Sequence, residues 1–181
     1  MKYETIVINF FGGPGTSKSI TAADVYAKIR WAGINAEIAL EYAKELVFAK
    51  DMGKLQNQVY ITGQQLQRLV RLNGQVEVIV CDSPLLLSTF YDKNKSNALR
   101  DLCLEQFNKF NNINYFINRK DELFETEGRI HNLEESKKKD RQIKTFLELY
   151  DIPYEEIEAG PESCIRIAET IINNINDKRN T

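Results

Sequence analysis

Residues 10–19 read FFGGPGTSKS, a glycine-rich stretch that runs into lysine and serine. The spacing nearly matches G-x-x-x-x-G-K-S/T, a pattern in which a turn of backbone N–H groups holds phosphates. The one departure is Ser17, which stands where the last glycine of the pattern belongs. The stretch is therefore a working phosphate loop, a degenerate one, or a chance turn.

The residues on either side of the glycines favour a working loop. Residues 5–11, TIVINFF, form a short apolar run with β-branched residues, which is typical of a buried strand. Residues 18–32 are rich in helix formers and stop at Gly33, as a helix end does. A strand before the turn and a helix after it place the anion at a helix N-terminus. The predicted loop consists of Gly12, Gly13, Pro14, Gly15, Thr16, Ser17, Lys18 and Ser19.

Strand-like and helix-like segments alternate along the rest of the chain. Further strands are predicted over residues 35–41, 76–83, 113–119 and 152–159. Helices are predicted up to about residue 52, over 54–74 and 98–110, from 133, and over 160–175. This alternation requires a parallel sheet with right-handed crossovers. We therefore predict an α/β fold: one three-layer α/β/α domain over residues 1–181, with a five-stranded parallel sheet and a frayed tail at about 176–181.

Composition and length limit the class of protein. The chain has 181 residues, of which 43% are hydrophobic and 28% charged, enough for one core. It shows no apolar run long enough for a membrane span and no signal-peptide pattern, so we expect a cytoplasmic protein without a membrane partner. The net charge of -2 argues against a protein that wraps nucleic acid, but permits a local basic patch. Three scattered cysteines predict buried free thiols.

Two acidic residues close predicted strands. Ligands of open α/β sheets bind at the C-terminal ends of the strands, where Asp82 and Glu41 stand. Asp82 can hold Mg²⁺ together with the Ser19 hydroxyl or act as a base; alternatively, it caps the turn before Pro84. Glu41 can face a metal or accept the proton of an acceptor hydroxyl. Alternatively, it is an acid that complements the dipole at a helix start.

Four arginines are candidate anion contacts. Arg119 and Arg129 flank a polar stretch without periodicity, and we predict a short lid over about residues 120–132. Such arginines can neutralise charge on a transferring phosphoryl group; alternatively, they are surface residues. Arg68 and Arg71 are three apart on one predicted helix face and either bind an acidic acceptor or are solvated. His131, the only histidine, is expected to be solvated.

Together these motifs resemble the NadR-type AAA family of P-loop kinases, which contains the nicotinamide-riboside-kinase domain, and especially its small phage-encoded members. The resemblance covers about residues 5–158. It rests on FGGPGTSKS, LEYAKELV, QLQRLVRL, GQVEVIVCDSPLLLSTFY and NYFINRKDELFETEGRIHNLEES. Two departures are Ser17 and the segment DELFETEG, where many phage relatives carry proline.

The resemblance implies a nucleoside/nucleotide-kinase-like P-loop fold that uses ATP and Mg²⁺ to phosphorylate a substrate hydroxyl. Some phage relatives phosphorylate 5-hydroxymethyluracil in DNA, so the implied partner is a nucleoside, a nucleotide or hydroxymethylated DNA in the host cytoplasm. Small kinases of this kind are frequently homodimers, although no stretch here indicates an interface. The implied site consists of Lys18 at the phosphates, Ser19 and Asp82 at Mg²⁺, Glu41 after the second strand, and Arg119 and Arg129 in the lid.

Two other classes of function remain open on the sequence. One is a P-loop ATPase or nucleotide-binding switch without a phosphoryl acceptor. A GTPase would need N-K-x-D, and NKSN at residues 94–97 lacks its aspartate, while an AAA motor would need a longer chain. The other is a binding protein with an inactive loop. If DNA were the acceptor, the basic positions Arg68, Arg71, Lys93, Lys95 and Lys137, Lys138 and Lys139 should contact its phosphates.

Overall fold

The fold is built on five parallel strands in the order β2-β3-β1-β4-β5. The computed structural model describes residues 2–119 and 133–180. The strands are β1 (Ile6–Phe11), β2 (Ala36–Ala39), β3 (Val78–Cys81), β4 (Asn111–Asn118) and β5 (Glu155–Glu158). The predicted α/β architecture with a five-stranded parallel sheet is therefore confirmed.

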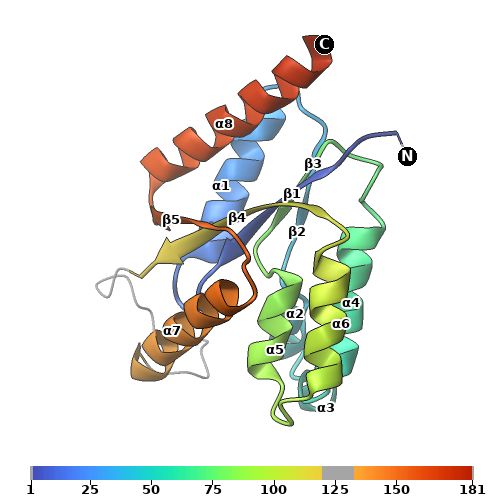
Figure 1. Cartoon of the computed structure of the whole chain (residues 1–181), viewed down its shortest axis with the longest axis vertical. Coiled ribbons are helices and arrows are strands. Elements are labelled where there is room, and N and C mark those ends of the chain that lie inside the picture. The colour runs from blue at the N-terminus through green and yellow to red at the C-terminus, as the bar shows by residue number, and fades with distance from the viewer. Residues whose placement is uncertain (1, 120–132, 181) are drawn as a thin grey trace.

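Helices cover both faces of the sheet (Figure 1). One face carries α1 (Lys18–Trp31) and α8 (Pro161–Asn180), which pack against each other. The segments between β2 and β3 and between β3 and β5 supply the remaining helices. They are α2 (Tyr42–Phe48), α3 (Met52–Leu55), α4 (Gln58–Val70), η1 (Leu85–Leu87), α5 (Ser88–Tyr91), α6 (Asn97–Phe107) and α7 (Leu133–Leu149). The result is the expected three-layer arrangement.

Side chains of β1 alternate between the hydrophobic cores on the two faces of the sheet, because successive residues of a strand point to opposite faces. Ile6, Ile8 and Phe10 join the core beneath α1 and α8. Phe11 joins the core formed with η1, α6 and α7. Burial on both faces explains why this strand reads as a continuous apolar run.

A group of buried and half-buried asparagines lies between β1 and β4. Asn9 is 1% exposed, and its Nδ2 donates to Asn112 Oδ1 at 2.8 Å and to Asn114 Oδ1 at 3.0 Å. Asn9 pairs with Asn114 in the register that also brings Phe11 beside Phe116. These bonds satisfy polar groups within the core, and they fix β1 at the point where it leads into the glycine turn.

The structure corrects several boundaries. The helix predicted over residues 54–74 is two helices, and Asn57 separates them by accepting the N–H of Tyr60 as the N-cap of α4. η1 and α5 were not predicted as helices. The tail predicted to fray from about residue 176 is instead helical, because α8 continues to Asn180. The predicted lid at residues 120–132, with Arg129 and His131, lies outside the described residues.

Two further expectations concern cysteines and membrane spans. Cys81, Cys103 and Cys164 are all buried and free, as predicted. Within residues 2–119 and 133–180, every helix is too short or too polar to cross a membrane.

Candidate functional site

The glycine turn joins β1 to α1 and is held together by hydrogen bonds to one of its own carbonyl oxygens. Gly13 O accepts hydrogen bonds from Thr16 Oγ1 at 3.0 Å and from Lys18 Nζ at 2.8 Å. Gly12 has φ +145°, and a Cβ there would lie 2.5 Å from Thr16 Oγ1, so only glycine fits this turn. The predicted strand, loop and helix are therefore arranged as a phosphate loop requires.

Ser17 is the N-cap of α1 and adopts the left-handed conformation, with φ 61° and ψ 22°. This region favours glycine, which is the residue that the motif has at this position. Within the described part of the chain, the Ser17 side chain makes no capping hydrogen bond to α1. The departure from the motif therefore leaves the backbone in the conformation expected for glycine.

Ser19 and Asp82 meet at the start of α1. Ser19 Oγ donates to Asp82 Oδ2 at 2.7 Å. Asp82 is 2% exposed, and its Oδ1 has no hydrogen-bond partner among the described residues. Burial raises the pKa of Asp82, and the Ser19 hydroxyl and the Lys18 charge oppose that rise. The buried Oδ1 of Asp82 is suited to a further ligand.

The oxygens of Ser19 and Asp82 fit Mg²⁺, which is commonly held by one or two carboxylates, waters and nucleotide phosphates. Among residues 2–119 and 133–180, no group of three or more His, Cys, Asp or Glu side chains could hold a metal without help. A cation here would thus take its other ligands from water and phosphate.

Lys18 lies among three carboxylates. Burial lowers the pKa of its ammonium, and the negative charges of Glu41, Asp82 and Asp140 oppose this effect. The carboxylates come from the ends of β2 and β3 and from α7, so elements far apart in the sequence converge at the loop. Asp140 was not predicted.

Glu41 occupies the N-cap of α2, which agrees with its predicted place after the second strand. Its side chain makes no capping hydrogen bond within the described residues. Burial is the main cause that raises the pKa of Glu41, the Asp82 charge adds to it, and Lys18 opposes it. A carboxylate with a raised pKa beside the loop is suited to accept a proton.

Tyr91 and Lys139 also face this region; Tyr91 was not predicted as a site residue, and Lys139 was considered only as a contact to DNA phosphates. Burial raises the pKa of Tyr91, and the charges of Glu41 and Asp140 raise it further. The Lys139 ammonium lies 5.2 Å from the Tyr91 ring centroid and donates to the carbonyl of Phe90. Lys139 is half-buried. The available signal was an aromatic residue soon after CDSP.

Arg119 lies against the loop. Its Nη2 donates to Pro14 O and its Nε to Asp140 Oδ2, both at 2.7 Å, and its side chain is 5% exposed. The structure therefore brings Arg119 to the glycine turn.

The arginines of α4 are placed differently. Arg68 Nη2 pairs with Glu45 at 2.6 Å, and its Nη1 donates to Leu40 O at 3.2 Å. Its guanidinium lies over the Tyr42 ring, 5.2 Å from the centroid. Arg71 is exposed at the C-terminus of α4. Arg68 thus contacts the turn that carries Glu41.

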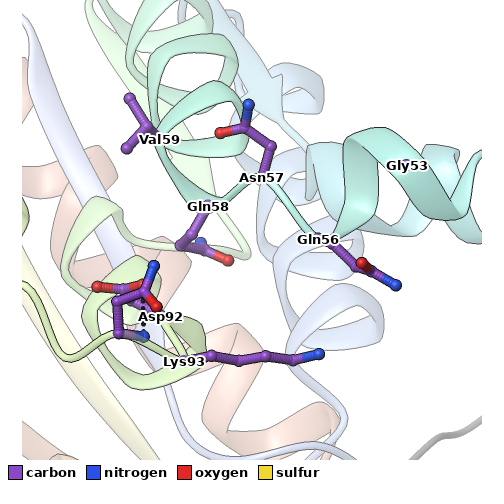
Figure 2. A pocket seen from close by; sticks show the side chains of 8 residues that line it. Gly53, Gln56, Asn57, Gln58, Val59, Asp92 and Lys93 are labelled. Carbon is purple, nitrogen blue, oxygen red and sulfur yellow. Dashed lines mark hydrogen bonds between the residues drawn. The ribbon is translucent and has the colours of Figure 1, made fainter.

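A separate cleft of about 350 Å³ lies between the α3–α4 junction and the segment after α5 (Figure 2). Its described lining includes neither the loop nor Glu41 or Asp82. The lining residues are Gly53, Gln56, Asn57, Gln58, Val59, Asp92, Lys93 and Asn94. Asn57 and Asp92 use their side-chain oxygens to accept backbone N–H groups of the chain itself.

Solved structures share this fold at low sequence identity. A structure of NadR protein in complex with NR has a TM-score of 0.58 and 14% identity, and the match covers 86% of this chain and 43% of that one. Deoxyadenosine kinase from M. mycoides with bound dATP has a TM-score of 0.55 and 19% identity, with 97% and 100% covered. The same kinase with products dCMP and dCDP gives 0.53 and 16%, with 96% and 98% covered.

These likenesses show the fold alone, which is an α/β fold like that of P-loop nucleoside and nucleotide kinases. This chain spans less than half of the NadR chain. No curated protein matches it. The model of a protein family described as an AAA domain matches residues 7–163, which include the loop, Glu41, Asp82 and Arg119. The chain therefore belongs to this AAA-domain family, whose P-loop implies nucleotide binding.

Proposed function

We propose that the protein is an ATP-dependent kinase that transfers the γ-phosphoryl group to a hydroxyl of a nucleoside- or nucleotide-type acceptor. The observation that carries this proposal is the position of Glu41. A phosphate loop with Ser19 and Asp82 would suffice for an ATPase or a switch. A second carboxylate beside Lys18, with a raised pKa and no capping bond among the described residues, is what an acceptor hydroxyl requires.

The loop and its neighbours supply the nucleotide side of this reaction. Lys18 and the loop N–H groups hold the β and γ phosphates. Ser19 and Asp82 hold Mg²⁺, which when bound neutralises charge on the phosphates. The present Lys18–Gly13 bond keeps the ammonium at the loop, where phosphate oxygens can reach it.

The acceptor side is formed by Glu41 and Tyr91. The acceptor oxygen forms a bond to the γ phosphorus, the bond from that phosphorus to the β–γ bridging oxygen breaks, and ADP leaves. Glu41 takes the proton of the acceptor hydroxyl. Its raised pKa increases its strength as a base. Asp82 serves the metal in this assignment, which leaves Glu41 as the base.

Several acceptors fit this chemistry. The solved structures of similar fold contain NR, dATP, dCMP or dCDP. Hydroxymethyluracil in DNA presents the same kind of hydroxyl. Lys139 lies beside Tyr91; burial lowers the pKa of Lys139, and the neighbouring positive charges of Lys138 and Lys95 lower it further. These lysines favour an acceptor that carries phosphate, as a mononucleotide or as DNA.

Calorimetry with ATP and Mg²⁺ tests the nucleotide site. Lys18→Ala should weaken ATP binding by about 10- to 100-fold, because charged hydrogen bonds contribute roughly 1.5–3 kcal/mol. Lys28→Ala is the matched control, since it removes a lysine of the same helix that pairs with Asp24 instead of the loop. Equal ATP affinity in the wild type and Lys18→Ala would overturn the assignment of the loop.

Phosphoryl transfer from radiolabelled ATP tests the acceptor. The panel consists of nucleosides, mononucleotides and DNA that contains hydroxymethyluracil, each at two salt concentrations. Labelling of DNA that falls steeply with salt would identify a DNA acceptor, because phosphate contacts are screened. ATP hydrolysis with no labelled acceptor would instead support a P-loop ATPase or switch.

A further inference from the structure

Asp140 of α7 connects the phosphate loop to Arg119. Its Oδ1 accepts the backbone N–H of Gly13 at 2.6 Å, and its Oδ2 accepts Arg119 Nε at 2.7 Å. Arg119 Nη2 donates to Pro14 O at 2.7 Å, which completes a ring of hydrogen bonds through Gly13, Asp140, Arg119 and Pro14. Three hydrogen bonds thus join the loop, the end of β4 and α7. The helix α7 begins more than a hundred residues after the loop.

The ring is tightly packed. The side chains of Arg119 and Asp140 are 5% and 15% exposed. A Cβ on Gly13 would lie 2.7 Å from Asp140 Oδ1 and 2.9 Å from the backbone oxygen of Ser136. Gly13 is therefore required by the close approach of α7. Charge-assisted hydrogen bonds in such a setting hold geometry more firmly than neutral ones.

The charges in the ring bear directly on phosphate binding. Asp140 is close enough for its negative charge to act on Lys18. A carboxylate at a phosphate loop repels the nucleotide unless a cation balances it. Arg119 is placed to provide that balance while it also holds the Pro14 carbonyl.

We propose that Asp140 is a positioning residue of the phosphate loop, and that Arg119 supports ATP binding through Asp140 and Pro14. Asp140 fixes the Gly13 N–H and the Arg119 side chain, and Arg119 cancels the charge of Asp140. This inference rests on the proposed function, because it requires the loop to bind ATP. It assigns Arg119 a role that differs from direct contact with the transferring phosphoryl group.

A double-mutant cycle tests the pair. We expect Arg119→Ala to weaken ATP binding at least tenfold, because Asp140 loses its ion-pair partner at the loop. The double variant Arg119→Ala with Asp140→Ala should recover several-fold of that loss, since the repulsion is gone. Arg119→Ala with Asp140→Asn should recover more, because the amide oxygen can still accept the Gly13 N–H. The dissociation constants are measured by calorimetry with ATP and Mg²⁺.

Controls separate positioning from a general loss of stability. Arg179→Ala breaks an Arg–Glu pair with Glu77 elsewhere in the structure and should lower the unfolding temperature with unchanged ATP affinity. Arg119→Lys keeps the charge, and its ATP affinity should lie between those of the wild type and Arg119→Ala; it replaces Arg119→Ala if that variant does not fold.

Two outcomes would overturn the inference, and they differ in what else they overturn. If the wild type binds ATP but both double variants bind as weakly as Arg119→Ala, then Arg119 contacts the nucleotide directly and only this inference fails. If the wild type binds no ATP, the proposed function fails and this inference fails with it.

Discussion

The left-handed backbone conformation of Ser17 is unfavourable, and its side chain makes no hydrogen bond to α1 that would compensate for it. A residue with a Cβ in the left-handed region is disfavoured by about 1–2 kcal/mol relative to glycine. A serine at an N-cap normally stabilises the helix because its hydroxyl oxygen accepts a backbone N–H. In the described structure the Ser17 hydroxyl accepts no such hydrogen bond. The hydroxyl is thus available to a phosphate.

Ser17→Gly should stabilise the protein. The relief of backbone strain, less the extra flexibility of glycine in the unfolded chain, leaves a gain of about 0.5–1 kcal/mol. The unfolding midpoint should rise by roughly 1–4 °C. ATP binding should remain intact or tighten, as calorimetry can measure.

Ser17→Ala is the matched control for that substitution, because it keeps the strained backbone and removes only the hydroxyl. It should leave the midpoint near that of the wild type. Loss of ATP binding in both variants would contradict the expectation and would show that the Ser17 hydroxyl is itself a phosphate ligand.

Prediction from sequence reached the site residues that lie in local motifs. Lys18 and Ser19 belong to one contiguous turn, and Asp82 follows an obvious buried strand. Asp140 lies 127 positions from Gly13 in the sequence, within a lysine-rich helix that reads as a solvated face. Its role depends on how α7 packs against the loop, and no short-range pattern encodes that packing.

Among the elements, α4 holds the turn that carries Glu41. Arg68 donates to Leu40 O, and Gln65 Oε1 accepts the N–H of Tyr42 at 3.1 Å, so both neighbours of Glu41 are fixed. Gln65 is 3% exposed. Arg68, for which either binding of an acidic acceptor or solvation was predicted, contacts the turn that carries Glu41.

Gln65→Ala should therefore affect catalysis more than ATP binding. It leaves the Tyr42 N–H without its partner, which costs about 1–3 kcal/mol of stability. Because Glu41 loses its fixed position, kcat for phosphoryl transfer should fall at least tenfold, in the same direction as for Glu41→Gln, while the ATP dissociation constant changes little.

Gln67→Ala is the control for this prediction, since Gln67 is exposed on the same helix. Gln67→Ala should leave kcat and the ATP dissociation constant unchanged. Gln65→Ala with normal kcat would show that the turn keeps its shape without this bond.

Element boundaries were harder to predict than element types. Hydrophobic periodicity indicated α6 and α7, but it ran across the break between α3 and α4. That break is set by the side-chain cap at Asn57, which competes with a continuous helix. The residues of η1 and α5 lie in the segment LLLSTFY, which is too short for a helical period to be recognised.

At the scale of the whole molecule, strand order assembles the site. Alternation predicted five parallel strands, but not the order β2-β3-β1-β4-β5. With β3 beside both β1 and β2, the residues that follow these three strands meet at one edge of the sheet. This order brings the loop, Asp82 and Glu41 together. Sequence spacing alone does not determine which crossover goes to which side.

The C-terminal helix α8 ends near the N-terminal end of β3, at the opposite end of the strands from the loop. Arg179 Nη2 lies 2.7 Å from Glu77 Oε2, next to the start of β3, and Glu77 Oε2 also accepts the N–H of Asn35 at 3.0 Å. Burial by itself would raise the pKa of Glu77, but Arg179 and the Asn35 N–H more than offset it, so the pKa lies below its ordinary value. The end of α8 is thus a folded part of the molecule.

Arg179→Ala should lower the stability in a way that depends on pH. A carboxyl group with a depressed pKa stabilises the fold above its unfolded pKa and loses that contribution as pH falls through its folded pKa. The variant should therefore unfold a few degrees below the wild type at pH 7, and the difference should be smaller at about pH 4, below the ordinary pKa of glutamate. Thermal unfolding at both pH values measures it, with Arg166→Ala, which breaks a more exposed pair with Glu155, as the control. Equal midpoints at pH 7 would show that the last turn of α8 does not stabilise the fold through Glu77.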